Sequence, residues 1–313
     1  MKHMAYPTEA CSFRKRSRRA EIAFSVLSFL FWTVVLLIVL YPLWLILIAS
    51  VSDPNAVIRG RVVLLPIDFS LMGYKAVLNY RELFVGYLNS AFYTFTGTAL
   101  SVLITMACAY ALTRDFPGKR VISVLIVFTM FFSGGLIPIY LNVRSLHLYN
   151  TRTVMILMNL VSVWNLMVAR VYIQKTLPEE LYEAAILDGA DHFTIFFRIV
   201  LPLSGGLLAV LSIYYGVMRW NDYFTAMIML RDQDLFPLQL VIKDILTSYN
   251  SVGSSASFFE GYVGDAGGIQ EFLRLADVAK YCCIVISSVP PVLAFLLTQK
   301  HFTRGVLIGS LKG

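Results

Sequence analysis

Charged residues are scarce in this sequence. Only 14% of its 313 residues are charged and 58% are hydrophobic, whereas a soluble globular protein carries about 25% charged and roughly 45–50% apolar residues. The four cysteines show neither a metal-binding spacing such as C-x-x-C nor a disulfide framework. These shortages exclude a soluble enzyme, a disordered chain and a disulfide-stabilised secreted domain.

The sequence also lacks the motifs of nucleotide chemistry and catalysis. Its one Gly-Lys pair, Gly118-Lys119, is followed by Arg120 and has no upstream glycine, so it is not a phosphate-binding loop. The four histidines lie outside the long hydrophobic stretches, with no serine, cysteine or carboxylate partner at a recognisable spacing. We therefore expect a protein that is not an enzyme, with no metal site and no cofactor bound to this chain.

Long hydrophobic runs are what the sequence has in abundance, and its mean hydropathy is +0.71. A membrane-spanning helix needs about 20 mostly apolar residues. Six segments qualify: about 24–50, 87–112, 121–141, 154–173, 207–230 and 281–298. The prediction is an all-α, polytopic integral membrane protein with six transmembrane helices, the last of them kinked at Pro290-Pro291.

The distribution of positive charge orients these spans. Five of the six residues at 14–19 are basic, directly before the first hydrophobic run, and the net charge is +7. Basic segments beside a span stay in the cytoplasm, and this interpretation is favoured over nucleic-acid binding. Both termini are then cytoplasmic, with a basic extension at 1–23 and a six-span domain at 24–313.

Two connecting loops are unusually long. The loop at about 231–280 falls outside the membrane and contains glycine- and serine-rich stretches around an aromatic run, so it is either functional or disordered. The loop at about 174–206 falls inside and is acidic in its first half, which argues against contact with an anionic lipid surface.

The inner loop is predicted to form two short helices. Thr176-Leu177-Pro178-Glu179 fits a capping box for the first helix, and Asp188-Gly189 fits its end. Asp191 is placed to cap a second helix, which Pro202 ends or bends. Two helices meeting at a glycine would protrude from the membrane as a knob.

This loop carries a specific resemblance. Glu183-Ala184-Ala185, then three residues, Gly189, nine residues and Ile199-Val200-Leu201-Pro202 match the "EAA" loop of the permease subunits of binding-protein-dependent ABC importers. Asn89-Ser90, Trp220-Asn221-Asp222 and the C-terminal stretch 302–313 resemble the carbohydrate-uptake group of that family. Residues 132–138 and 148–151 resemble a subgroup that imports complex oligosaccharides.

The resemblance, which covers about residues 23–313, implies a type I ABC importer permease fold with defined partners. These are a second permease subunit, expected to be a different chain, two ATPase subunits and an extracellular or periplasmic solute-binding protein. ATP and magnesium would bind to the ATPase subunits, and the protein would lie in a bacterial cell (inner) membrane. The residues implied in coupling to the ATPase are Glu183, Ala184, Ala185, Gly189, Ile199, Leu201 and Pro202.

Polar residues within the spans are costly and usually face a cavity or another helix. Two sets stand out as a candidate substrate path: Asn159, Ser162 and Asn165 on the fourth span, and Tyr215, Arg219, Trp220, Asn221 and Asp222 on the fifth. The first set falls at i, i+3 and i+6, near one helical face. Helix–helix hydrogen bonds with an internal Arg219–Asp222 ion pair are the alternative interpretation.

If this path is filled with water, we expect the side chains of Tyr215, Trp220 and Asn221 to be partly accessible to water. Those of Val217 and Met218 should be less accessible. Amide, carboxylate and aromatic groups suit a polyhydroxylated ligand, and an oligosaccharide is the predicted solute. Two alternatives remain: an ABC permease for an amino acid, phosphate or other non-sugar solute, and an ion-coupled secondary transporter without an ATPase.

Overall fold

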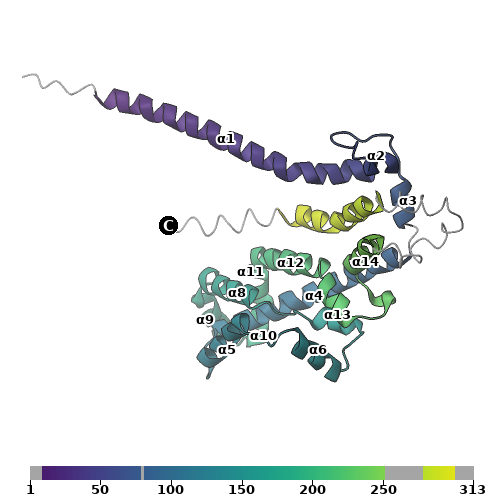
Figure 1. The fold of residues 1–313 in the computed structure, drawn as a ribbon. Helices are drawn as coiled ribbons and strands as arrows, with labels where there is room; N and C mark the ends of the chain where they lie inside the picture. Colours follow the sequence, from purple (N-terminus) through teal and green to yellow (C-terminus); the bar gives the residue numbers. More distant parts are fainter. Residues whose placement is uncertain (1–8, 79–80, 251–277, 300–313) are drawn as a thin grey trace, which may run out of the picture.

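The computed structural model describes residues 9–78, 81–250 and 278–299, and all regular structure in these ranges is helical (Figure 1). The prediction of an all-α protein is confirmed. The C-terminal stretch 300–313, most of the 231–280 loop and the first eight residues of the 1–23 extension lie outside the described residues.

The described helices vary widely in length. They are α1 Glu9–Ser50, α2 Pro54–Ile58, α3 Met72–Leu78, α4 Arg81–Thr113, α5 Lys119–Phe131, α6 Leu136–Ser145, α7 Arg152–Leu157, α8 Val163–Thr176, α9 Glu179–Leu187, α10 His192–Ile195, the π-helical turn η1 Phe196–Val200, α11 Leu201–Leu203, α12 Gly205–Trp220, α13 Tyr223–Met229, the 3₁₀ turn η2 Gln233–Leu235, α14 Leu238–Asn250 and a final helix Val278–Gln299.

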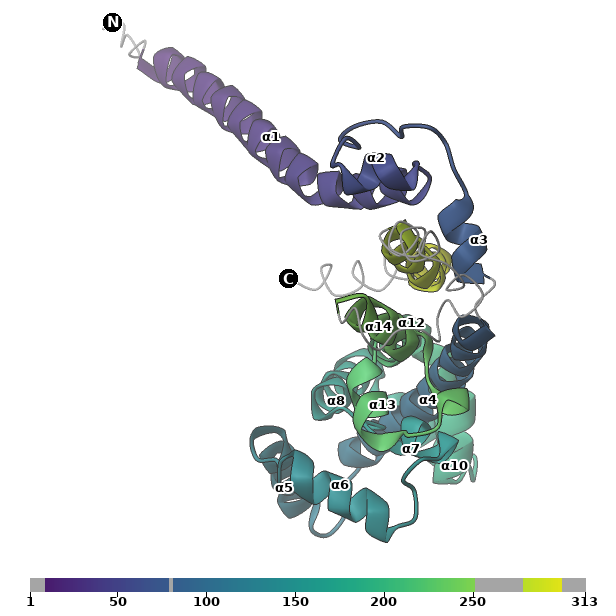
Figure 2. The same cartoon turned by 45° about the vertical axis from the view of Figure 1, so that its right-hand side comes forward.

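Helix α4 is the central element of the bundle. It packs against α12, α8 and α14, and Figure 2 shows these helices gathered around it. Almost half of its most apolar stretch is buried, whereas none of the corresponding stretch of α1 is. Helix α1 therefore lies apart from the bundle and contacts the remainder mainly at its end, through Ile48 against Ala56 and Val62.

Three helices are long and apolar enough to cross a membrane as continuous spans: Glu21–Ser50, Arg81–Thr113 and Val278–Gln299. They contain the predicted spans 24–50, 87–112 and 281–298. Two bent pairs of helices also pass the same test of length and composition, so the described residues contain three to five candidate spans. The predicted count of six is not confirmed.

The other three predicted spans are broken helices. The 121–141 segment turns by 116° between α5 and α6, where Gly135 has a φ of +86°. The 154–173 segment is interrupted between α7 and α8, where Asn159 has a φ of +53°. The 207–230 segment is split between α12 and α13 at Asn221 and Asp222. Hydrophobicity extends through each break, but the backbone there is not helical.

Buried polar groups of α4 hold the segment before α14. Asn89 Nδ2 donates to the carbonyls of Asp234 (2.8 Å) and Phe236 (3.1 Å), and Ser90 Oγ accepts a hydrogen bond from the amide of Leu238 (2.8 Å). Both side chains are buried. The Asn89-Ser90 pair, which supported the family resemblance, thus satisfies backbone groups that would otherwise be buried without partners.

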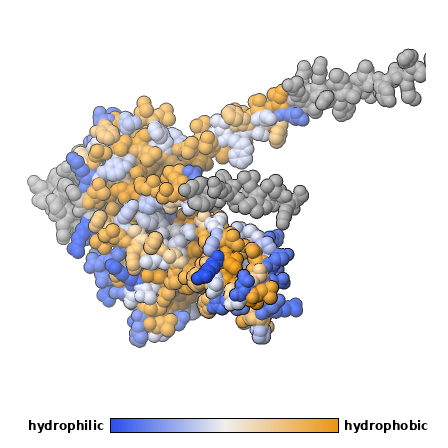
Figure 3. All heavy atoms as spheres, turned by 180° about the vertical axis from the view of Figure 1, so that it is seen from behind, coloured by the Kyte–Doolittle hydropathy of each residue, from blue (hydrophilic) through white to orange (hydrophobic). Residues whose placement is uncertain are grey.

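The surface of the described residues is largely apolar. Figure 3 shows hydrophobic side chains over most of the face in view, with hydrophilic ones mainly towards its margin. Exposed side chains of this kind include Phe95, Val124 and Leu297. A contiguous apolar exterior of this extent requires lipid or partner subunits to cover it.

Candidate functional site

The inner loop folds as two short helices joined at a glycine, as predicted. Helix α9 ends at Leu187, and Gly189 adopts a left-handed conformation with a φ of +79°. The amides of Gly189 and Ala190 donate to the carbonyls of Ile186 (3.0 Å) and Ala185 (2.9 Å). This closure satisfies carbonyls at the end of α9, and it requires a residue that tolerates positive φ.

The start of α9 differs from the prediction. Pro178 occupies the N-cap position without any side-chain cap, while Thr176 is the last residue of the preceding helix α8. The predicted capping box is therefore wrong. Hydrophobic packing at Leu177 and Tyr182, both buried, positions this end of the loop instead.

The second helix is capped as predicted. The carboxylate of Asp191 accepts a hydrogen bond from the amide of Thr194 (3.0 Å), and hydrogen bonds from Thr194 hold the pKa of Asp191 below its ordinary value. The chain then continues through η1 and α11, so Pro202 does not end the helix. The break comes at Ser204, and α12 leaves at 83°.

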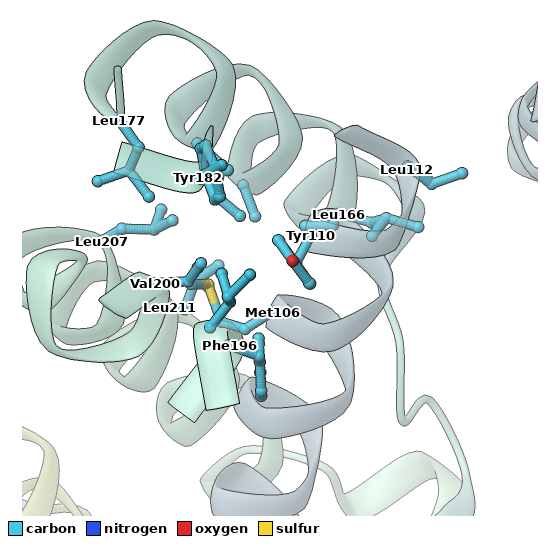
Figure 4. Close-up of a cluster of buried hydrophobic side chains, with 14 of the residues drawn as sticks. Met106, Tyr110, Leu112, Leu166, Leu177, Tyr182, Phe196, Val200, Leu207 and Leu211 are labelled. Atoms are coloured by element: carbon cyan, nitrogen blue, oxygen red, sulfur yellow. The ribbon is translucent and has the colours of Figure 1, made fainter. Parts of the chain in front are cut away.

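One side of the loop is packed against the end of α4. Figure 4 shows Tyr110 of α4, Tyr182 of α9 and Phe196 of η1 pointing into a single hydrophobic cluster. Tyr110 and Tyr182 stack with their ring centroids 6.2 Å apart, and the Tyr110 hydroxyl lies 3.0 Å from Nδ1 of His192. The loop is therefore in direct contact with the end of the central helix.

Arg114 adds a charged contact to this cluster. Its Nη1 lies 2.7 Å from Oε1 of Glu179, and its guanidinium carbon lies 3.8 Å from the ring centroid of Tyr182. Burial raises the pKa of the Tyr182 hydroxyl, while the nearby Arg114 opposes that rise. This role was not predicted from the sequence. Its signal was an arginine close to the end of a predicted span, together with an acidic loop elsewhere in the chain.

The seven residues implied in coupling divide by exposure. Glu183, Ala184, Gly189 and Pro202 are exposed, Ile199 and Leu201 are half-buried, and Ala185 is buried. Leu187, which the motif does not include, has 88% of its surface exposed and Phe193 has 76%. The exposed surface of the loop thus combines small residues, carboxylates such as Glu183, and large apolar side chains such as Leu187 and Phe193.

The polar residues of the predicted fourth span do not share a helical face. Asn159 lies exposed in the break before α8, and Ser162 is the N-cap of α8, where its hydroxyl accepts a hydrogen bond from the amide of Asn165 (3.5 Å). The Asn165 side chain is buried, and its Nδ2 has no hydrogen-bond partner.

Tyr215 and Trp220 of α12 are buried, contrary to their expected accessibility. Tyr215 is fully buried, and its hydroxyl lies 2.8 Å from Thr105 Oγ1 and accepts a hydrogen bond from the amide of Ser162 (3.0 Å). Trp220 is also buried and donates from Nε1 to the carbonyl of Ser287 (2.9 Å). Both residues join helices rather than face an aqueous path.

The expected order of exposure along α12 is likewise reversed at two positions. Val217 has 41% of its surface exposed and Met218 has 37%, so these residues are more accessible than Tyr215 or Trp220. Only Asn221, which is exposed at the end of α12, matches the expectation. Helix α12 therefore turns Tyr215 towards α4 and Trp220 towards the final helix.

Arg219 and Asp222 do not form the expected ion pair. The guanidinium donates from Nη1 to the carbonyl of Met155 (2.9 Å) and from Nη2 to the hydroxyl of Ser101 (2.9 Å). Asp222 instead caps α13, accepting a hydrogen bond from the amide of Thr225 (3.0 Å). Arg219 is 7% exposed and joins α12, α7 and α4. Its long-range partners could not be inferred from helical spacing.

Comparison with known proteins identifies this architecture. No family model matches the chain. The polygalacturonan/rhamnogalacturonan transport system permease protein YtcP of Bacillus subtilis (strain 168) is 34% identical over 291 residues, which cover 93% of this chain and 98% of that protein. This chain belongs to the carbohydrate ABC importer permeases. The predicted family is thereby confirmed.

Two further comparisons agree with this family. The arabinooligosaccharide transport system permease protein AraQ of Halalkalibacterium halodurans is 28% identical, covering 88% of this chain and 92% of that protein. A crystal structure of a bacterial ABC transporter that imports the acidic polysaccharide alginate contains a chain of the same fold. Its TM-score is 0.82 at 30% identity, with 91% of this chain and 98% of that chain covered.

The described residues contain no cluster of side chains suited to a metal ion. In residues 9–78, 81–250 and 278–299, no three His, Cys, Asp or Glu side chains are grouped so that they could hold a metal ion. The related proteins are transport permeases and not enzymes.

Proposed function

We propose that this permease is the membrane subunit of an ATP-driven importer that passes an oligosaccharide delivered by a solute-binding protein. It works with a second, different permease chain and with two ATPase subunits that bind ATP and magnesium. The complex lies in the bacterial cell (inner) membrane, with both termini of this chain in the cytoplasm. The 231–280 loop lies outside the membrane.

The observation that carries this proposal is the geometry of the loop from α9 to η1. Its outward side exposes Glu183, Ala184 and Leu187, and Phe193 is exposed beyond the left-handed Gly189. Small residues allow close approach to a groove, the carboxylate offers a hydrogen-bonding anchor, and the large apolar side chains require a partner to cover them. We propose that this surface docks in a groove of an ATPase subunit.

The inward side of the loop explains how docking would move the membrane helices. Tyr182 and Arg114 tie α9 to the end of α4, and η1 continues through α11 to the bend before α12. A displacement of the loop is therefore transmitted to two helices that pack against each other. Packed elements of this kind shift between discrete arrangements rather than deforming continuously.

The breaks in the helices supply polar groups for the substrate path. Asn159 and Ser162 lie in the break between α7 and α8, and Asn221 and Asp222 lie in the break between α12 and α13. Non-helical backbone at membrane depth is tolerated where it lines a cavity or is covered by protein. We propose that these residues contact the passing sugar, while Arg219 holds together the helices that carry them.

The class of sugar is proposed from the relatives together with these polar groups. The YtcP relative is a polygalacturonan/rhamnogalacturonan permease and the solved relative imports alginate, an acidic polysaccharide. Hydroxyl-rich chains suit the amide groups at Asn159 and Asn221. The proposed solute is an oligosaccharide, and oligomers of uronic acids are the first to test.

Reconstitution tests this function. The permease is co-expressed with its partner subunits and reconstituted in proteoliposomes with the solute-binding protein and internal ATP. We expect ATP-dependent uptake of at least one labelled oligosaccharide, with uronic acid oligomers compared against neutral oligomers, amino acids and phosphate. Uptake that continues without ATP but follows an ion gradient would contradict the proposal, as would uptake of a non-sugar solute alone.

A further inference from the structure

A cavity of about 830 Å³ lies between the start of α5 and α8. Its lining includes three basic side chains, Lys119, Arg120 and Arg170, and one acidic side chain, Asp115. Lys119 and Asp115 pair with each other at 2.9 Å. Within the described part of the chain, Arg120 and Arg170 have no ion pair or hydrogen bond, so the cavity keeps two uncompensated positive charges.

The backbone adds to this positive environment. Helix α5 has 13 residues, and its N-cap Gly118, at a φ of +85°, supplies no side-chain hydrogen bond. Among the first-turn amides of α5, that of Lys119 donates to the carbonyl of Phe116 (3.2 Å), whereas those of Arg120 and Val121 have no side-chain cap. The positive end of the helix dipole therefore lies at the cavity. Ser123, one turn further on, also lines the cavity, and its buried hydroxyl has no hydrogen-bond partner. Cations, amides and a hydroxyl together recognise a phosphate group.

The remainder of the lining is apolar and leads away from the charges along α5. Val121, Val124 and Val127 follow at i, i+3 and i+6, and all three are exposed. Such an apolar strip offers no favourable contact to a soluble phosphate, whereas the acyl chains of a phospholipid would pack against it. The cavity also lies beside the 113–120 connection, which joins two candidate spans and therefore falls at the membrane boundary.

We infer that this cavity binds the headgroup of an anionic phospholipid, such as phosphatidylglycerol. Arg120 and Arg170 contact the phosphate from α5 and α8, the first-turn amides of α5 and Ser123 complete its hydrogen bonds, and the acyl chains lie along the valines. Basic pockets between membrane helices are suited to anionic headgroups. Such a lipid would hold α5 against α8 at the membrane boundary.

The test uses the complex with its partner subunits in nanodiscs of phosphatidylcholine with increasing phosphatidylglycerol. Native mass spectrometry measures retained phosphatidylglycerol for the wild type and for Arg120→Gln/Arg170→Gln. We expect roughly 30-fold weaker retention in this double variant, since each arginine near a membrane surface contributes about fivefold. Arg120→Lys/Arg170→Lys should retain most of the lipid. Arg59→Gln, the same change at an exposed residue of another segment, should have no effect.

Two further experiments distinguish a lipid headgroup from a soluble phosphate and from a partner subunit as the occupant of the cavity. Excess inorganic phosphate should not displace the lipid, and displacement would indicate a site for a soluble anion. A photo-crosslinking residue at Val124 should form adducts with phosphatidylglycerol in the otherwise native complex. Adducts with a partner subunit alone, or equal lipid retention by the wild type and the glutamine variant, would overturn the proposal. Should the glutamine variant fail to assemble, the crosslinking experiment on the otherwise native complex is the deciding test.

Discussion

Replacing Gly97 with alanine is expected to destabilise the folded permease by about 3 kcal/mol. A Cβ atom at position 97 would lie 2.5 Å from Nη1 and 2.6 Å from Cζ of Arg219. The guanidinium would have to move and lose its hydrogen bonds to Met155 and Ser101. A buried cation without partners costs on the order of 3 kcal/mol, which exceeds the gain of up to about 1 kcal/mol from replacing a helical glycine.

A double-mutant cycle isolates this effect. In the Arg219→Met background, the flexible methionine can yield to the new methyl group, so Gly97→Ala should cost less than about 1 kcal/mol. Gly216→Ala is the matched control on α12, because its Cβ would meet nothing nearer than Thr98 Oγ1 at 3.8 Å. The free energy of unfolding is measured by reversible denaturation in mixed detergent. Equal effects of Gly97→Ala and Gly216→Ala would contradict the assigned role of Arg219.

Replacing Gly189 with valine is expected to lower ATP-driven uptake at least about tenfold while leaving the bundle folded. No atom lies within 4 Å of a Cβ built at this position, so the effect comes from the backbone alone. A φ of +79° costs a β-branched residue about 1–3 kcal/mol, and about 1.4 kcal/mol already equals a tenfold change in a conformational equilibrium. The loop would therefore leave the conformation that docks.

Gly189→Asn is the matched control, because asparagine tolerates the left-handed conformation far better than valine. It should keep most of the uptake and most of the stimulation of ATP hydrolysis by the loaded binding protein. Both variants are compared at equal amounts of assembled complex. Wild-type uptake by Gly189→Val would show that the glycine conformation is not needed for coupling.

The sequence predicted best where a local rule determines the structure. Asp191 caps a helix because its carboxylate reaches an amide three residues ahead, and Gly189 ends one because of its positive φ. The three continuous spans follow from uninterrupted hydrophobicity. In contrast, the break at Asn159 depends on a single left-handed residue, which a hydrophobicity profile does not register.

Long-range partners could not be predicted by spacing rules. The spacing of Arg219 and Asp222 predicted an ion pair, yet Asp222 is used as a local cap and the arginine binds a carbonyl 64 residues away in the sequence. Tyr215 was expected to face water, but its hydroxyl satisfies the backbone amide of Ser162 at the start of α8. Such assignments require the packing of α4, α8 and α12 to be known.

Site-specific photo-crosslinking from Leu187 tests the docking of the loop on an ATPase subunit most directly. This side chain has 88% of its surface exposed on the outward side of the loop, whereas Phe95 is 79% exposed on α4 and serves as the control for an apolar membrane-facing position. We expect an adduct with the ATPase from position 187 and none from position 95. An assembled complex that gives no ATPase adduct from position 187, or equal adducts from both positions, would contradict the proposed docking.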